Sequence, residues 1–192
     1  MGKIYYVMGK SSSGKDTIYK KLLKTYPELH TIVPYTTRPI RDGEQDGVEY
    51  FFIDRLRLSD MEESGQIIEE RSYNTKCGVW TYFTADDGQI DLEHYNYLMI
   101  GTLVSFQALK EYFGEKSLVP IYIEVEDGER LSRALEREKH QPVPHYAEIC
   151  RRFLADEDDF SEENLKRAGI AHRFRNQELS ECLMEIREYI GL

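Results

Sequence analysis

A run of seven residues near the start of the chain has the residue types and spacing of a phosphate-binding loop. The pattern G-x-x-x-x-G-K is filled by Gly9, Lys10, Ser11, Ser12, Ser13, Gly14 and Lys15. In such a loop the glycines let the backbone curl until successive N–H groups point at an anion, and the positive end of the following helix adds to the field. Lys15 then supplies a point charge to the outer phosphates. The run therefore predicts a site for the phosphates of a nucleotide.

Asp16 follows this lysine at the position where such a loop normally carries Ser or Thr, and Thr17 comes next. A bare carboxylate beside phosphates is repulsive. It becomes favourable if Mg²⁺ lies between them, because Mg²⁺ is commonly held by one or two carboxylates together with substrate phosphates. Alternatively, Asp16 only favours the N-terminus of the following helix, as acidic residues do there. The loop itself leaves both interpretations open.

Two arginines three positions apart, Arg38 and Arg41, predict a second anion site. They lie in a loop rich in Pro, Gly and Asp, which precedes a tyrosine-rich segment. Arginine suits bidentate recognition of a phosphate because its guanidinium presents parallel N–H donors. Two such groups held in one turn would form an anion clamp.

The elements that must position these residues alternate between strands and helices. Short apolar runs predict core strands over 3–8, 97–102 and 118–125. Amphipathic stretches predict helices over 16–26, 104–113, 128–139, 146–160 and 179–190. The prolines of 140–145 separate the third helix from the fourth, since proline cannot continue a helix interior.

The middle of the chain has a different pattern, with short strands predicted over 48–53, 67–73 and 79–84. A helix over 58–65, ended by Gly65, separates the first two of these strands. The whole pattern predicts an α/β fold with a parallel-sheet core and an inserted, smaller, β-rich lobe. With 192 residues the chain is long enough for one domain with a sizeable core.

Composition limits the classes of partner. Apolar residues make up 41% of the chain and charged residues 31%, which is ordinary for a soluble protein. The formal net charge of −10 disfavours nucleic acid and anionic lipid as partners, because both are polyanions. No apolar run approaches a membrane span of about 20 residues, and no N-terminal signal peptide is indicated. Oligomeric state is not predicted.

The three cysteines, Cys77, Cys150 and Cys182, lie far apart and show no zinc-ligand spacing. They indicate reduced thiols in a cytoplasmic protein. The acidic run 156–164 is interpreted as a solvated helix face and loop. None of the five histidines is placed for general-base chemistry.

The segment around the arginine pair resembles the guanylate kinase family. The family pattern T-T-R-x-x-R-x-G-E-x-x-G-x-x-Y is filled by Thr36, Thr37, Arg38, Arg41, Gly43, Glu44, Gly47 and Tyr50. The resemblance extends through the phosphate loop, whereas the C-terminal third of the chain fits loosely.

The resemblance implies a P-loop fold with helices on both faces of the parallel sheet. The core would comprise about 1–33, 85–130 and 155–192, with a lobe for a nucleoside monophosphate at about 34–84 and a helical lid at about 131–154. It also implies transfer of the γ-phosphoryl group of ATP, with Mg²⁺, to an acceptor phosphate. Loop residues from Gly9 to Thr17 would bind ATP.

The resemblance implies roles for specific residues. Arg38, Arg41 and Tyr50 would hold the acceptor phosphate, and Glu69 matches the family position that contacts the guanine base. Lid arginines would close over the ATP phosphates, and the candidates are Arg133, Arg137 and Arg152. The match is clearest for Arg152, while Arg137 is displaced by one position from the family's lid arginine. Lys15, Arg38, Arg137 and Arg152 are the expected catalytic residues.

The departures from the family pattern concern the base. A usual serine is replaced by Pro34, a Tyr-Gly-Ser or Tyr-Gly-Thr run by Cys77, Gly78 and Val79, and the two aspartates of a strand by Met99 and Gly101. Sites that hydrogen-bond their substrate reject analogues strongly, so losing such groups relaxes or changes the choice. The first missing aspartate helps to hold Mg²⁺ in P-loop enzymes, which predicts that Asp16 compensates for it.

GMP is the default acceptor, and two alternatives stay open. A loop with Asp after its lysine also resembles kinases for ribose 1,5-bisphosphate and phage deoxynucleotide kinases, so the acceptor could be another phosphorylated molecule. Guanylate-kinase-like domains can also lose catalysis and become binding modules. The intact Lys15 and glycine loop argue against a binding module.

Overall fold

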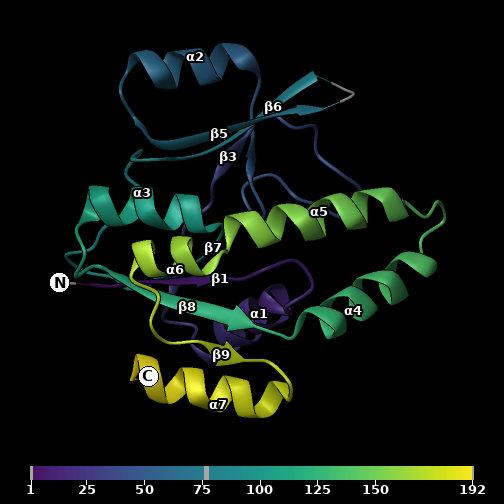
Figure 1. Ribbon diagram of the computed structural model, residues 1–192. Helices are drawn as coiled ribbons and strands as arrows, with labels where there is room; N and C mark the ends of the chain where they lie inside the picture. Colours follow the sequence, from purple (N-terminus) through teal and green to yellow (C-terminus); the bar gives the residue numbers. More distant parts are fainter. Residues whose placement is uncertain (1, 76–77, 192) are drawn as a thin grey trace.

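A computed structural model describes residues 2–75 and 78–191. The chain forms two sheets and seven helices within these ranges, arranged as in Figure 1. The strands are β1 (Ile4–Met8), β2 (His30–Thr31), β3 (Tyr35–Thr36), β4 (Phe51–Phe52), β5 (Ile67–Thr75), β6 (Gly78–Ala85), β7 (Tyr97–Ile100), β8 (Leu118–Glu124) and β9 (Phe174–Arg175). The helices are α1 (Lys15–Thr25), α2 (Arg55–Glu63), α3 (Leu103–Phe113), α4 (Asp127–Lys139), α5 (Tyr146–Asp159), α6 (Glu162–Ala168) and α7 (Leu179–Ile190).

The core sheet has the order β2-β7-β1-β8-β9, and its strands pair in parallel. Strand β1 lies at its centre and is buried along its whole length. Ile4, Tyr6 and Met8 pack toward α3 and α6, while Tyr5 and Val7 pack toward α1 and α7. Because helices cover both faces, the strand is continuously apolar rather than alternating. The predicted α/β core with helices on both faces is confirmed.

The second sheet, with the order β4-β3-β6-β5, stands beside the core and carries α2 (Figure 1). Tyr35 and Phe83 stack at its centre, with ring centroids 5.0 Å apart. Met61 of α2 packs into the same apolar cluster. The three-part division of the chain into core, lobe and lid stays a prediction.

Two details of the local structure differ from the prediction. The strand expected over 48–53 is reduced to β4, because a turn occupies the start of the segment: Gly47 N–H donates to the Tyr50 carbonyl at 2.9 Å. Helix α6 was not predicted; its first three residues, 162–164, belong to the acidic run that is interpreted as a solvated helix face and loop. Among the described residues, no helix is long and apolar enough to cross a membrane.

Candidate functional site

The phosphate loop connects β1 to α1 and is shaped by one glycine and one asparagine. Gly14 has a φ of 86°, and a Cβ at this position would lie 2.4 Å from Asn176 Nδ2. That amide nitrogen donates to the Ser13 carbonyl at 2.8 Å. Asn176 follows β9, and no motif in the sequence marks it; the pairing of β9 with β8 brings it to the loop. It therefore supports the loop without being predictable from the sequence.

Lys15 begins α1, and two of the predicted lid arginines lie beside it. Arg137 Nη2 donates to Ser12 Oγ at 3.2 Å. Burial lowers the pKa of Lys15, and the charge of Asp16 opposes that shift. The charges of Arg152 and Arg137 lower the same pKa further, so all three cations act on one small volume. The structure thus brings together three of the four residues predicted to be catalytic.

Arg133, also predicted to belong to the lid arginines, has other contacts. Its Nε pairs with Glu129 at 2.9 Å. Its Nη2 donates to the Asn176 carbonyl at 3.2 Å. Arg133 therefore links α4 to the segment that supports the phosphate loop.

Asp16 lies in the first turn of α1, and its side chain is 77% exposed. Its Oδ2 is 3.9 Å from Lys15 Nζ. No side chain caps this end of α1 by a hydrogen bond. The described residues hold no group of three or more metal-ligating side chains. The carboxylate is thus open to solvent beside the predicted phosphate site, a position compatible with both interpretations of Asp16.

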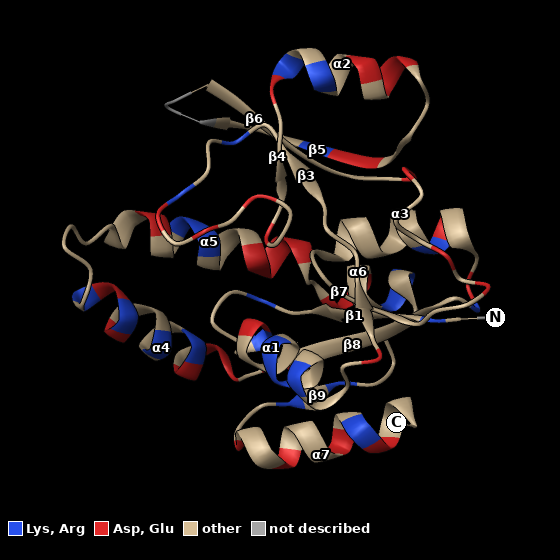
Figure 2. Cartoon of the chain, turned by 180° about the vertical axis from the view of Figure 1, so that it is seen from behind, with Lys and Arg blue, Asp and Glu red and all other residues tan. Residues whose placement is uncertain are grey.

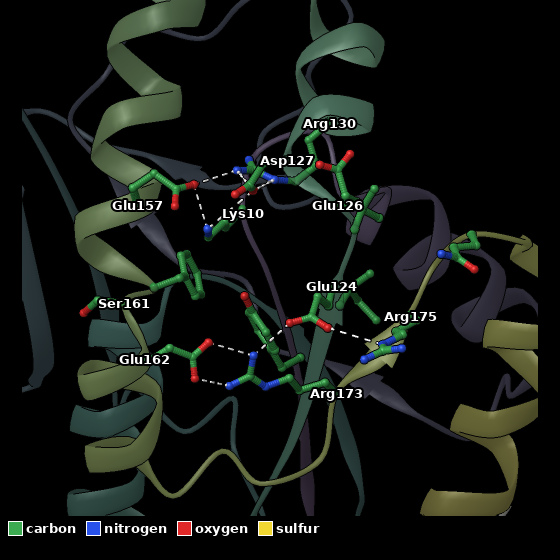
Figure 3. Close-up of a pocket in the computed structure, with 15 residues that line it drawn as sticks. Lys10, Glu124, Glu126, Asp127, Arg130, Glu157, Ser161, Glu162, Arg173 and Arg175 are labelled. Atoms are coloured by element: carbon green, nitrogen blue, oxygen red, sulfur yellow. Dashed lines mark hydrogen bonds and ion pairs between the residues drawn. The ribbon is translucent and has the colours of Figure 1, made fainter.

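A network of charged groups ties α4 and α5 to the phosphate loop (Figure 3). Lys10 Nζ and Arg130 Nη2 both donate to Glu157 Oε1, at 2.6 and 2.9 Å. Arg130 Nη1 donates to the Ser11 carbonyl at 3.1 Å, while the Ser11 N–H donates to Asp156 at 2.8 Å. The beginning of α4 and the end of α5 are therefore both fixed to the loop.

The prediction that the acidic run 156–164 is a solvated helix face and loop is wrong for its first residue, Asp156. Figure 2 shows acidic residues gathered near the end of α5, but the Asp156 side chain is only 14% exposed. The reason is Arg130, whose side chain is 1% exposed. A buried charge without partners is costly, so Arg130 requires carboxylates around it. Its spacing of three from Asp127 on one helix was a signal that could have identified it.

A cavity of about 560 Å³ lies beside this network, between α4, α5 and strands β8 and β9 (Figure 3). On its far side Arg173 Nη1 pairs with Glu124 and Glu162, at 2.9 and 2.8 Å. Lys10, Arg130 and Arg173 thus all have carboxylate partners. Their charge is therefore compensated within the protein.

The predicted anion clamp is built around a buried arginine. Arg38 is 3% exposed and forms a bidentate pair with Glu44, with Nη1 and Nη2 at 2.9 and 2.8 Å from the two oxygens. The guanidinium carbon lies 5.6 Å from the ring centroid of Tyr50 and 5.4 Å from that of Phe52. Glu44 also accepts the Arg41 N–H at 2.8 Å. The Arg41 guanidinium is exposed and makes no hydrogen bond or ion pair with any described residue, so it is available to a ligand.

Tyrosines connect this clamp to β5. The Tyr82 ring packs edge-on against Tyr50, with centroids 5.7 Å apart, and the motif did not identify it. Burial raises the pKa of Tyr50, while the charges of Arg71 and Arg38 oppose the shift. The Tyr50 phenol therefore lies within the electrostatic influence of both arginines.

Glu69, the predicted base contact, accepts three hydrogen bonds within the protein. Its Oε2 accepts from Arg71 Nε at 3.0 Å. Its Oε1 accepts from Thr84 Oγ1 at 2.8 Å and from Arg71 Nη2 at 3.3 Å. Arg71 Nη1 in turn donates to Thr102 Oγ1 at 2.9 Å, which joins β5 to the start of α3.

Two of the departures from the family pattern lie at the end of β7. Met99 is 3% exposed and belongs to the apolar cluster beneath α3. Gly101 faces Tyr6, and a Cβ at Gly101 would lie 2.0 Å from the Tyr6 hydroxyl oxygen. The volume that a side chain at position 101 would need is therefore filled by a phenol from β1.

The remaining departures lie on the second sheet. Pro34 accepts the Phe51 N–H at 2.9 Å, and Val79 is 38% exposed on β6. Neither side chain offers a polar group to a base. Cys77 lies outside the described residues.

Comparison with known proteins finds relatives for the N-terminal part of the chain. Residues 1–80 match the guanylate kinase family model. Guanylate kinase of Legionella pneumophila (strain Lens) is 43% identical over 68 residues, which are 35% of this chain and 32% of that protein. Guanylate kinase of Coxiella burnetii is 36% identical over 78 residues, which are 38% of each chain. The aligned part of the chain thus spans between 32% and 38% of these relatives.

The whole fold also matches. The crystal structure of guanylate kinase from Anaplasma phagocytophilum aligns with a TM-score of 0.69 at 19% identity, covering 99% of this chain and 85% of that one. The sequence match is confined to the part that carries the phosphate loop, the clamp and Glu69. Beyond that part, the likeness of the chain to the solved guanylate kinase is a likeness of fold.

Proposed function

We propose that this protein transfers the γ-phosphoryl group of ATP to GMP, giving GDP and ADP. The observation that carries the proposal is the meeting of Lys15 with Arg137 and Arg152 at the phosphate loop. Three cations beside the phosphate loop suit the charge that develops on a phosphoryl group during transfer. The names of the relatives and the clamp around Arg38 support a phosphorylated acceptor.

The residues act by positioning and by neutralising charge. Lys15 and the loop amides would hold the ATP phosphates, and the lid arginines would offset developing charge and exclude water. The Glu44 carboxylate fixes the orientation of Arg38, so that the acceptor phosphate meets Arg38 and the open guanidinium of Arg41. No general base is required, because the acceptor phosphate is already a nucleophile.

Asp16 is the residue that would hold Mg²⁺, and its exposed, uncapped carboxylate beside Lys15 fits that role. The ion, when bound, would supply positive charge to the β- and γ-phosphates. A single carboxylate is sufficient because the phosphates and water provide the other oxygen ligands.

Replacing Asp16 with alanine is expected to raise the Mg²⁺ concentration required for half-maximal activity about tenfold. Calorimetric titration of ATP at several Mg²⁺ concentrations should show the same loss in binding. Glu28→Ala, at an exposed acid just beyond the end of α1, is the matched control. A role in favouring the helix terminus alone would leave the Mg²⁺ dependence of Asp16→Ala unchanged and lower only its thermal stability.

Three further assignments complete the proposal. The four-stranded sheet with α2 would be the acceptor lobe, α4 and α5 with their connection the lid, and the remainder the core. The partners would be small nucleotides and not nucleic acid. Cytoplasmic location stays a prediction. Lys10 would bind ATP only through its backbone, because its ammonium group donates a hydrogen bond to Glu157.

The test is phosphoryl transfer from Mg²⁺-ATP to a panel of nucleoside monophosphates and sugar phosphates. GMP is expected to be turned over. Turnover of a sugar bisphosphate or a deoxynucleotide in place of GMP would replace the proposed acceptor. A chain that binds nucleotides and phosphorylates none of the panel would instead be a binding module.

A further inference from the structure

We propose that Arg71, and not Glu69, reads the base of the acceptor nucleotide, through the carbonyl oxygen O6 and nitrogen N7 of a 6-oxopurine. This inference rests on the proposed function, because it concerns the same acceptor site. It makes Glu69 a positioning residue that orients Arg71. It also predicts which purines the site distinguishes.

The hydrogen-bonding capacity of Glu69 is largely used within the protein. Its two oxygens accept three bonds, two from Arg71 and one from Thr84. Its side chain is only 4% exposed. To contact the N1–H and the 2-amino group of guanine, the carboxylate would have to give up charge-assisted bonds in a poorly solvated place, where they are strongest.

Arg71 retains donors that a ligand can reach. A guanidinium has five N–H donors, and three of those in Arg71 are used by Glu69 and Thr102. One hydrogen on each terminal nitrogen has no partner among the described residues. The side chain is 18% exposed, against 4% for Glu69. The side chain that can still bind a base is therefore a donor of hydrogen bonds and not an acceptor.

A pair of arginine donors matches one edge of guanine. Bidentate contact of arginine with O6 and N7 is the commonest specific contact of this side chain with guanine in nucleic-acid complexes. Hypoxanthine presents the same two acceptors. Adenine keeps N7 but carries an amino donor at position 6, which would face the Arg71 donors.

The opposite edge of guanine finds no acceptor at the position where the family carries one. A carboxylate at position 101 could bind only donors on the base, since it is acceptor-only when ionised. Gly101 has no side chain, and the Tyr6 phenol fills the volume that one would need. The charges of Arg71 and Glu69 both act on this phenol. Arg71 can thus donate hydrogen bonds to O6 and N7, whereas the 2-amino group finds no carboxylate at position 101.

Two guanine analogues separate the two modes of reading. Inosine monophosphate lacks only the 2-amino group, and 7-deaza-GMP lacks only N7. We expect kcat/KM for inosine monophosphate within about threefold of GMP, with 7-deaza-GMP about tenfold lower and AMP about a hundredfold lower. The reverse pattern, with GMP preferred over inosine monophosphate by tenfold or more and 7-deaza-GMP equal to GMP, would show that a carboxylate reads the base and would overturn the proposal.

Variants locate the effect at Arg71. Arg71→Ala is expected to lower kcat/KM for GMP and inosine monophosphate by about tenfold to a hundredfold and to reduce the gap to AMP. Arg57→Ala, at an exposed arginine of α2, is the matched control and should leave all three ratios unchanged. Arg71→Lys keeps a charge beside Glu69 if the alanine variant folds poorly, and it should lose the 7-deaza discrimination because a lysine cannot donate in the bidentate fork. Retention of that discrimination in both variants would contradict the proposal.

Equilibrium binding of the same monophosphates without ATP keeps this inference separate from the proposed function. Equal affinities for GMP and inosine monophosphate, with weaker 7-deaza-GMP and AMP, support Arg71 as the reader even in a chain that transfers no phosphate. If GMP is turned over but binds much more tightly than inosine monophosphate, the 2-amino group is being recognised. That result would leave the proposed function in place and overturn the assignment of Arg71.

Discussion

Replacing Lys15 with methionine is expected to lower kcat/KM for phosphoryl transfer by about a thousandfold or more. Methionine keeps the apolar stem and removes only the charge. The carboxylate nearest to Lys15, on Asp16, is exposed and 3.9 Å away, so the ammonium is not neutralised within the protein and its charge is available to ATP. Steady-state kinetics with GMP and calorimetry with ATP would measure the loss.

The same substitution is expected to stabilise the free protein. Burial and the charges of Arg152 and Arg137 lower the pKa of Lys15 below its ordinary 10.5, which means that folding disfavours the charged form. Between the lowered value and 10.5 the unfolded chain binds more protons than the folded one, so wild-type stability should rise with pH in that window. Lys15→Met should lack this rise and melt at a higher temperature at pH 7.

The matched control is Lys20→Met, which removes an exposed lysine from the same helix. It should alter neither activity nor the pH dependence of melting. If Lys15→Met lost stability along with activity, the lysine would be supporting the fold, and its assignment to the phosphates would lose its main physical argument.

The residues predicted from the sequence share one property: they belong to short motifs whose geometry is local. The phosphate loop is fixed by the strand before it and the helix after it, and Arg38 with Glu44 is fixed within one turn. The central strand was predicted because burial on both faces leaves an unbroken apolar run. In these cases neighbours in sequence provide most of the contacts that decide the structure.

The residues that were missed depend on contacts between distant segments. Asn176 reaches Ser13 across 163 positions, and Arg130 reaches Ser11 across 119. The pairing of Arg71 with Glu69 is local, but its importance follows from Thr102, which only the packing of β5 against α3 brings near. A sequence pattern cannot supply such contacts, because polar residues in these segments look like ordinary surface residues until the sheet order is known.

Replacing Gly101 with alanine is expected to destabilise the protein by about 1–3 kcal/mol, because overpacking of a filled core costs that much. A Cβ at this position would lie 2.0 Å from the Tyr6 hydroxyl oxygen and 2.9 Å from its Cζ. Tyr6 is fully buried in the centre of the sheet and contacts Phe106, with ring centroids 5.5 Å apart, so the phenol has little room to move. Thermal and denaturant unfolding would measure the loss.

The matched control is Gly128→Ala, at a glycine near the start of α4. A Cβ there would lie 3.1 Å from the end of the flexible Glu126 side chain, which can shift. Alanine also favours a helix more than glycine does, so this variant should be neutral or slightly more stable.

A double-mutant cycle with Tyr6 tests the cause. Tyr6→Phe removes the atom at 2.0 Å but leaves Cζ at 2.9 Å, so it should restore part of the stability lost in Gly101→Ala. Tyr6→Val removes both atoms and should restore more of it, beyond the cost of its own cavity. Effects that add within about 0.5 kcal/mol would contradict the explanation, since groups in contact do not act independently. A strong coupling would mean that position 101 has no side chain because the Tyr6 phenol of β1 occupies the volume that one would need. The change at the proposed base end of the acceptor site would then involve β1 as well as the end of β7.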